Sequence, residues 1–328
     1  MTKKWNTVVF FVLMIMGSML TLNSSNWLSM WMGLEINLMM FLPLMKSKKT
    51  KSSEAIMMYF LVQSMSSMIL IMMLIMEKFI IMTPVIMNFS TNEIMMMSLF
   101  IKMGLPPFHM WMPALMNKIS WINNLMLMTW QKVAPLFLSS LIMKNTTIII
   151  TMVILTMIIS TMSGINQTSM RKIMAYSSMN HNGWMLSLMM FSNQWTLYFT
   201  IYIMMTGMLC IMLNKENMYY MNQMTQKSTS TKLLYTIMMA SMAGLPPFTG
   251  FMPKWITIQI MMENGMIMMT YIMVMSSIIT MFYYLRMMLP FLMINFTSNK
   301  MKKYSMKMES FMITINLILP ITMTMMKL

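Results

Sequence analysis

Charged residues are scarce in this sequence. They make up 9% of the 328 residues, against 58% that are hydrophobic, whereas a soluble domain carries about 25% charged residues. Too few polar side chains remain to cover a globule of this size in water. Apolar runs of about 20 residues, the length that crosses a bilayer core, recur along the chain. We therefore expect its solvent to be lipid.

Acidic residues are rarer still. All seven are glutamates, and they stand against 23 lysines and arginines, which gives a net charge of +16. A nucleic-acid-binding protein gathers its cations on soluble elements with aromatic residues between them. Here most cations lie in short connections between apolar runs, as in a polytopic membrane protein. The expected surroundings are a lipid bilayer, with no nucleic acid.

Cysteine is nearly absent. The single Cys210 excludes a disulfide framework and an iron–sulfur cluster, which takes about four thiolates. The sequence also has no glycine-rich nucleotide-binding loop of the G-x-G-x-x-G or Walker type. We therefore expect that this chain binds no cofactor itself.

Methionine, by contrast, accounts for 66 residues, and lysine far outnumbers arginine. This composition is typical of an A+T-rich genome in which a further codon is read as methionine, as in animal mitochondria. The alternative is a flexible, methionine-rich binding surface. The methionines spread over every apolar run, which favours their use as lipid-facing and core filler.

The apolar runs predict an all-α fold with about eleven transmembrane helices. The expected spans are 5–24, 26–45, 55–76, 94–117, 122–143, 146–164, 172–191, 194–213, 232–262, 265–289 and 309–326. With the N-terminus and every second connection on one side, that side receives seventeen cations and the other three. By the positive-inside rule, the N-terminus is then expected in the matrix and the C-terminus in the intermembrane space of mitochondria.

An internal repeat divides the spans. Gly-Leu-Pro-Pro-Phe at 104–108 recurs 140 residues later at 244–248, and Met-Pro follows each copy at the same offset. The motif falls in the fourth helix of each five-helix set, and because five is odd the two sets must be inverted. We expect one repeat at 1–143, an inverted repeat at 146–290, and a linker with a final helix at 291–328. Inverted repeats with discontinuous helices are a recurring transporter plan.

The proline pairs predict two broken helices. Two prolines remove backbone donors, and freed carbonyls within the membrane are tolerated only inside protein or beside water. We expect non-helical segments at 104–107 and 244–247 with internal water nearby. A simple proline kink is the alternative, and the repetition argues for the functional interpretation.

Four charged residues lie near these breaks or in the middle of a span: Glu35, Lys102, Lys132 and Lys254. Each costs a few kcal/mol to insert. Burial disfavours the charged form of a lysine, which suits lysines to pass protons near neutral pH. We interpret the four as a proton relay. Lys254 is the residue for which a position near the interface is the main alternative.

Two histidines also fall within spans. His109 follows the first break and is a candidate relay partner of Lys102 or Lys132. His181 is interpreted as a hydrogen-bonded packing residue. A two-haem site would need about four histidines, so haem ligation is disfavoured.

Several runs resemble a known family. They are WMGLEIN at 31–37, PPFH and its continuation at 106–113, LMTWQKVAP at 127–135, GINQT and its continuation at 164–178, and 244–255. Their order and identity are similar to those of subunit 2 of mitochondrial NADH:ubiquinone oxidoreductase (complex I), an antiporter-like membrane subunit. The resemblance covers roughly residues 20–290.

The resemblance implies a function. Glu35 matches the family's glutamate in its fifth helix. Lys102 and Lys254 match the lysines of the two broken helices, and Lys132 matches the central lysine. The chain would then be a translocase subunit without a redox centre, in a complex of the inner membrane that uses NADH and ubiquinone. Two departures are Leu105, where alanine is common, and the second repeat, in which Ala175 stands near the position of Glu35.

Two other functions stay open at this point. A stand-alone Na⁺/H⁺ antiporter component would share the fold, but the mitochondrial composition argues against it. A purely structural membrane subunit would have no need of three buried lysines.

Overall fold

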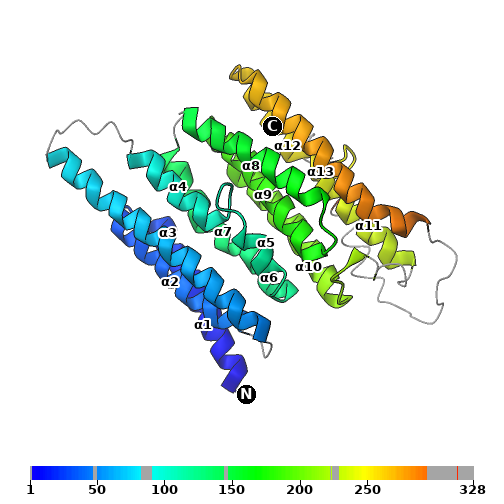
Figure 1. The fold of residues 1–328 in the computed structure, drawn as a ribbon, viewed down its shortest axis with the longest axis horizontal. Helices are drawn as coiled ribbons and strands as arrows, with labels where there is room; N and C mark the ends of the chain where they lie inside the picture. Colours follow the sequence, from blue (N-terminus) through cyan, green and yellow to red (C-terminus); the bar gives the residue numbers. More distant parts are fainter. Residues whose placement is uncertain are drawn as a thin grey trace. The chain divides into compact units, whose positions relative to one another are not determined.

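The structure is a computed structural model that describes residues 2–46, 50–82, 91–143, 147–221, 223, 229–293 and 316. Over these residues the chain forms thirteen α-helices (Figure 1). The first seven are α1 (Thr2–Asn23), α2 (Trp27–Met45), α3 (Thr50–Met82), α4 (Thr91–Met103), α5 (Trp111–Met116), α6 (Trp121–Met128) and α7 (Trp130–Ile142). The others are α8 (Thr147–Ile165), α9 (Met170–Met189), α10 (Trp195–Lys215), α11 (Thr229–Ala243), α12 (Phe251–Glu263) and α13 (Ile267–Met293).

Ten of the eleven expected spans coincide with one helix or with a pair of consecutive helices. Among the described residues, five segments are long and apolar enough to cross a membrane: Trp27–Met45, Ser52–Glu77, Trp121–Ile142, Trp195–Lys215 and Ile267–Leu289. Thr7–Asn23 and Ile149–Ile165 are shorter apolar helices. The eleventh expected span, 309–326, and the lysine-rich connection before it lie outside the described residues, apart from Asn316.

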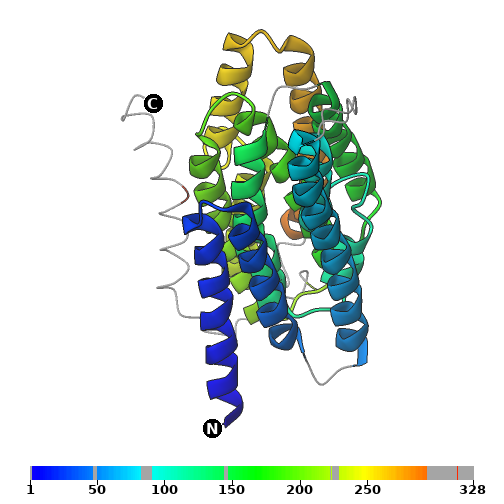
Figure 2. The ribbon, with the colours of Figure 1, turned by 90° about the vertical axis from the view of Figure 1, so that its left-hand side faces the viewer.

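The helices group into two compact units, residues 1–149 and 150–328. In the first unit, α1 and α2 run side by side (Figure 2), and α3 packs on both α2 and α4. In the second unit, α9 contacts α10 and α12, and α13 contacts α11 and α12. The five-helix repeats and their inverted relation stay predictions.

Glycines bring α1 and α2 close together. A β-carbon on Gly33 would lie 2.7 Å from the Gly17 carbonyl oxygen and 2.6 Å from the Thr21 methyl group. A β-carbon on Gly17 would lie 2.9 Å from the backbone nitrogen of Asn37. Small residues at such positions are what lets membrane helices pack closely without a hydrophobic driving force between them.

Helix α9 is long enough to cross a membrane but is too polar to be counted among the apolar spans. Of its residues, all but Arg171 and Lys172 are buried, including the polar run of Asn180, His181 and Asn182. A helix surrounded by other helices does not have to be apolar, provided that its polar groups find partners. It is therefore a central helix of the second unit rather than a lipid-facing one.

Candidate functional site

Both predicted helix breaks are present. Helix α4 ends at Met103 and α5 begins at Trp111, while α11 ends at Ala243 and α12 begins at Phe251. The expected breaks at 104–107 and 244–247 fall within these gaps. In both units the chain therefore leaves the helix within the fourth expected span and resumes it a few residues later.

The glycine of each motif, rather than the prolines, ends the helix. Gly104 has a φ of 67° and Gly244 a φ of 81°, a left-handed conformation that glycine adopts without steric cost. The Leu105 amide donates to the Phe100 carbonyl, and the Gly104 amide donates to the Ile101 carbonyl. The equivalent bonds run from Leu245 to Ala240 and from Gly244 to Ser241. This is the Schellman motif, and it appears twice.

Side chains satisfy further carbonyls at the two helix ends. The Gln63 amide donates to the Lys102 carbonyl oxygen at 3.0 Å, and the Lys254 ammonium donates to the Ala243 carbonyl oxygen at 2.8 Å. Protein side chains therefore supply a partner for each of these carbonyls, and the internal water expected beside them stays a prediction. A polar side chain from elsewhere in the same unit reaches each one.

The three predicted lysines are all buried: Lys102 is 6% exposed, Lys132 2% and Lys254 5%. Lys254 is therefore enclosed by other residues of its unit. Lys102 lies in the last turn of α4, Lys132 in the first turn of α7, and Lys254 in the first turn of α12. The two lysines of the break motifs stand on opposite sides of their breaks, since Lys102 precedes the first and Lys254 follows the second.

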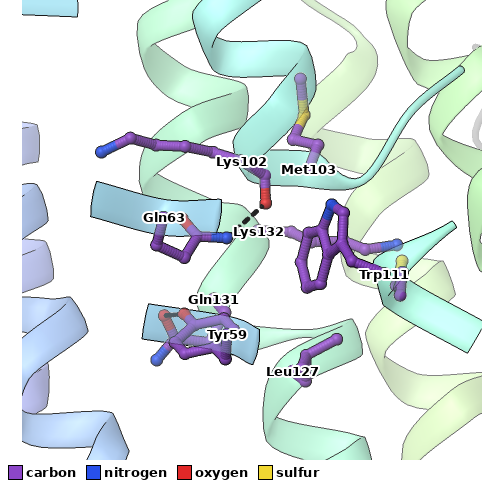
Figure 3. A pocket seen from close by; sticks show the side chains of 9 residues that line it. Tyr59, Gln63, Lys102, Met103, Trp111, Leu127, Gln131 and Lys132 are labelled. Atoms are coloured by element: carbon purple, nitrogen blue, oxygen red, sulfur yellow. Dashed lines mark hydrogen bonds between the residues drawn. The ribbon is translucent and has the colours of Figure 1, made fainter. Parts of the chain in front are cut away.

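Lys102 and Lys132 line one small cavity in the first unit (Figure 3). Its volume is about 10 Å³, which is about the size that holds one water molecule. In Figure 3 the two amine groups point in opposite directions. The other lining residues are Tyr59, Gln63, Met103, Trp111, Met112, Leu127 and Gln131.

Glu35 lies in the middle of α2 and is half-buried in this chain rather than enclosed. Its carboxylate interacts electrostatically with Lys102 and with Tyr59. Both Glu35 and Lys102 are among the described residues, and no ion pair within 4.0 Å joins them. The two charges are therefore near enough to interact but do not form an ion pair.

Sequence reasoning missed a set of neutral polar residues around Glu35 and Lys132. The Gln131 amide donates to Asn37 Oδ1 at 3.0 Å, and the Tyr59 hydroxyl donates to Gln131 Oε1 at 3.1 Å. Asn37 stands two residues after Glu35, and Gln131 directly precedes Lys132. Buried or half-buried amides in apolar spans are the signal that marks them, but their pairing across the chain leaves no sequence pattern.

Lys254 has two neighbours in the second unit. Its ammonium group bonds the Ala243 carbonyl and lies 6.0 Å from the centre of the Trp184 ring. The position at the C-terminus of α11 also suits a cation, because the helix dipole is negative there. Lys254 thus contacts the end of the helix that the break interrupts.

The histidines occupy different surroundings. His109 is buried in the first break, and its Nδ1 lies 3.3 Å from the Pro107 carbonyl oxygen; it does not line the cavity among the described residues. His181 Nδ1 lies 2.9 Å from the Tyr198 hydroxyl, so His181 is the hydrogen-bonded, buried residue that the sequence predicted. No group of three or more metal-ligating residues forms within the described ranges.

Comparison with known proteins gives the chain a family. Residues 24–280 match the family described as NADH:quinone oxidoreductase/Mrp antiporter, transmembrane. The chain is 39% identical over 326 residues to NADH-ubiquinone oxidoreductase chain 2 of Anopheles gambiae, covering 96% of this chain and 95% of that one. It is 39% identical over 285 residues to the same protein of Locusta migratoria, covering 85% and 83%.

Two solved structures share the fold. A chain of respiratory complex I from Thermus thermophilus with bound aureothin matches with a TM-score of 0.80 at 18% identity, over 94% of this chain and 75% of that one. A chain of the Mrp complex from Dietzia sp. matches with a TM-score of 0.76 at 17% identity, over 90% and 61%. The predicted all-α, polytopic, antiporter-like membrane fold is confirmed, and the chain belongs to the NADH-ubiquinone oxidoreductase chain 2 family of complex I membrane subunits.

Proposed function

We propose that this chain translocates protons as a membrane subunit of NADH:ubiquinone oxidoreductase in the mitochondrial inner membrane. Glu35, Lys102, Lys132 and Lys254 carry the protons, and His109 is a further candidate. Electron transfer from NADH to ubiquinone takes place on other subunits and drives the change in protonation. Neighbouring antiporter-like and small membrane subunits of the complex are the proposed partners.

The cavity shared by Lys102 and Lys132 is the observation that carries this proposal. Two buried lysines are costly in a membrane protein, and a purely structural subunit gains nothing from placing both at one water-sized space. With a water in this space, the polar side chains of Tyr59, Gln63 and Gln131 that line it connect the two lysines. The electrostatic interaction of Glu35 with Lys102 extends the series to α2.

A Lys132→Met substitution in the assembled complex tests the relay. Proton translocation and coupled ubiquinone reduction are expected to fall severalfold, because methionine cannot accept or release a proton. NADH oxidation with an artificial electron acceptor should stay unchanged, because electrons enter on other subunits. Both rates are measured on membranes, and native electrophoresis with NADH dehydrogenase staining measures the assembled complex.

Lys118→Met is the matched control for this experiment. Lys118 is also a lysine of the first unit, but it lies at a helix end and pairs with exposed Glu54 at 2.9 Å. Surface ion pairs contribute little to stability, so this variant should behave as the unmodified enzyme. If Lys132→Met lowered both activities together with the amount of complex, Lys132 would be a structural residue and the relay proposal would fail.

The orientation of the chain is a second part of the proposal. The seventeen-to-three division of cations places the N-terminus in the matrix and the C-terminus in the intermembrane space. In mitoplasts, protease added outside should leave the connection at 46–51 intact, whereas protease inside the matrix should cut it. Cleavage of this connection from the outer face would reverse the assignment.

A further inference from the structure

The helix is interrupted directly before the turn that carries Lys132. Helix α6 ends at Met128, and α7 starts only after Thr129, whose φ of −110° and ψ of −76° interrupt the helix. The Thr129 hydroxyl donates back to the Leu125 carbonyl, so it does not cap the start of α7. The Lys132 amide donates to the Thr129 carbonyl at 3.2 Å, a bond of the tighter 3₁₀ type.

Pro135 weakens the same turn from the other side. In an α-helix each amide donates to the carbonyl oxygen of the residue four positions earlier. Proline has no amide hydrogen and cannot make this bond. The carbonyl that loses this donor belongs to Gln131, because Pro135 lies four residues later in α7. The turn that carries Gln131 and Lys132 therefore depends on side-chain contacts for its position.

Gln131 supplies these contacts to three other helices. Its amide nitrogen donates to Asn37 Oδ1 in α2 at 3.0 Å and to Met14 Sδ in α1 at 3.3 Å. Its amide oxygen accepts the Tyr59 hydroxyl of α3 at 3.1 Å (Figure 3). Both amide donors and the carbonyl are thus engaged, which sets the orientation of the group.

We infer that Gln131 is a positioning residue that holds the first turn of α7 and thereby directs Lys132 toward the cavity. Consecutive helix residues point about 100° apart, so anchoring Gln131 to α1, α2 and α3 also determines where Lys132 points. The Tyr59 hydroxyl and the Asn37 amide are the fixed ends of this anchor. The inference rests on the proposed relay, since it assigns the residue that places one of its members.

Gln131→Leu tests the inference, because leucine keeps a similar volume and removes all three bonds. In the assembled complex, protons translocated per NADH oxidised should fall roughly fivefold, about the factor that one lost buried hydrogen bond is worth. The KM for ubiquinone and the rate with an artificial acceptor should not change. Hydrogen–deuterium exchange of the amides at 130–133 should become faster. If Gln131 did not hold this turn, its replacement would leave the exchange rate unchanged.

Ser139→Ala is the matched control on the same helix. Its hydroxyl donates to the Leu136 carbonyl oxygen one turn back, and Ser139 is not one of the residues that Gln131 bonds. Proton stoichiometry and exchange at 130–133 should match those of the unmodified enzyme. An unchanged stoichiometry in Gln131→Leu would overturn the inference.

Tyr59→Phe keeps the inference testable if Gln131→Leu fails to assemble. It removes a single hydroxyl and should lower the proton stoichiometry about twofold to threefold, because Gln131 loses one of its three bonds. A normal stoichiometry in Tyr59→Phe would then overturn the inference. If the Lys132→Met variant also translocated protons normally, the proposed relay would be wrong. If the Gln131 and Tyr59 variants translocated normally and the Lys132→Met variant did not, only the positioning role would be wrong.

Discussion

Replacing Gly250 by alanine is expected to prevent the complex from accumulating. A β-carbon at this position would lie 1.8 Å from the carbonyl oxygen of Ser241, a distance at which no side chain can be placed without moving the backbone. Gly250 has an ordinary φ of −68° and ψ of −14°, so the effect is purely steric. Overpacking of this kind costs about 1–3 kcal/mol, and more where backbone must shift.

The position of Ser241 makes the clash more severe. Its carbonyl accepts the Gly244 amide in the turn that ends α11. A shift of this carbonyl would disturb that turn and, next to it, the Ala243 carbonyl that Lys254 bonds. Assembled complex on native gels should therefore fall to a small fraction of the normal amount, and proton translocation should fall with it.

Gly207→Ala is the matched control. Gly207 lies in α10, and a β-carbon there would meet no atom within 4 Å. Alanine is about 1 kcal/mol more favourable than glycine in a helix interior, so this variant should assemble at least as well as the original chain. Normal assembly of Gly250→Ala would mean that the close approach of the second break to α11 is not needed.

The two helix breaks were predictable from the sequence, although not for the right reason. The proline pairs predicted an interruption, and it is present. The structure places the helix end at Gly104 and Gly244, because glycine adopts the left-handed conformation that a Schellman motif needs, and proline follows two residues later. The order of glycine before proline carried this information, so replacing one proline alone is not expected to rebuild the helix.

The partners of the freed carbonyls could not be predicted. Gln63 reaches the Lys102 carbonyl from 39 residues away, and a contact of this length leaves no periodicity in one sequence. Water was the default partner for a carbonyl within the membrane. The chain also uses an amide in the first unit and an ammonium group in the second, and the two copies of the motif differ in this donor.

The methionines do more than fill space in several places. Met14 accepts a hydrogen bond from Gln131, Met238 from Asn316, and Met170 from Tyr235. A thioether is a weak acceptor, yet it is one that leucine or isoleucine cannot provide. The even spread of methionine along the sequence predicted a general role in filling apolar space. It gave no sign of these individual hydrogen bonds.

Lys254→Met is expected to lower proton translocation about tenfold or more, because it removes two functions at once. The methionine cannot pass a proton, and it cannot donate to the Ala243 carbonyl, which Lys254 bonds at 2.8 Å. Leaving a buried carbonyl without its partner costs about 1–3 kcal/mol. The amount of assembled complex should therefore fall moderately, while translocation per assembled complex falls much further.

Lys254→Arg separates the two functions. Arginine keeps a donor and a positive charge at the C-terminus of α11, so it should restore much of the assembled complex. A guanidinium group stays protonated under all physiological conditions, and translocation per complex should remain as low as in Lys254→Met. Thr257→Ala, one turn further along α12, removes a hydroxyl bonded to the Lys254 carbonyl and should leave translocation normal. If Lys254→Arg translocated protons at the original rate, Lys254 would serve only to close the end of α11, and the relay would have to cross the second unit without it.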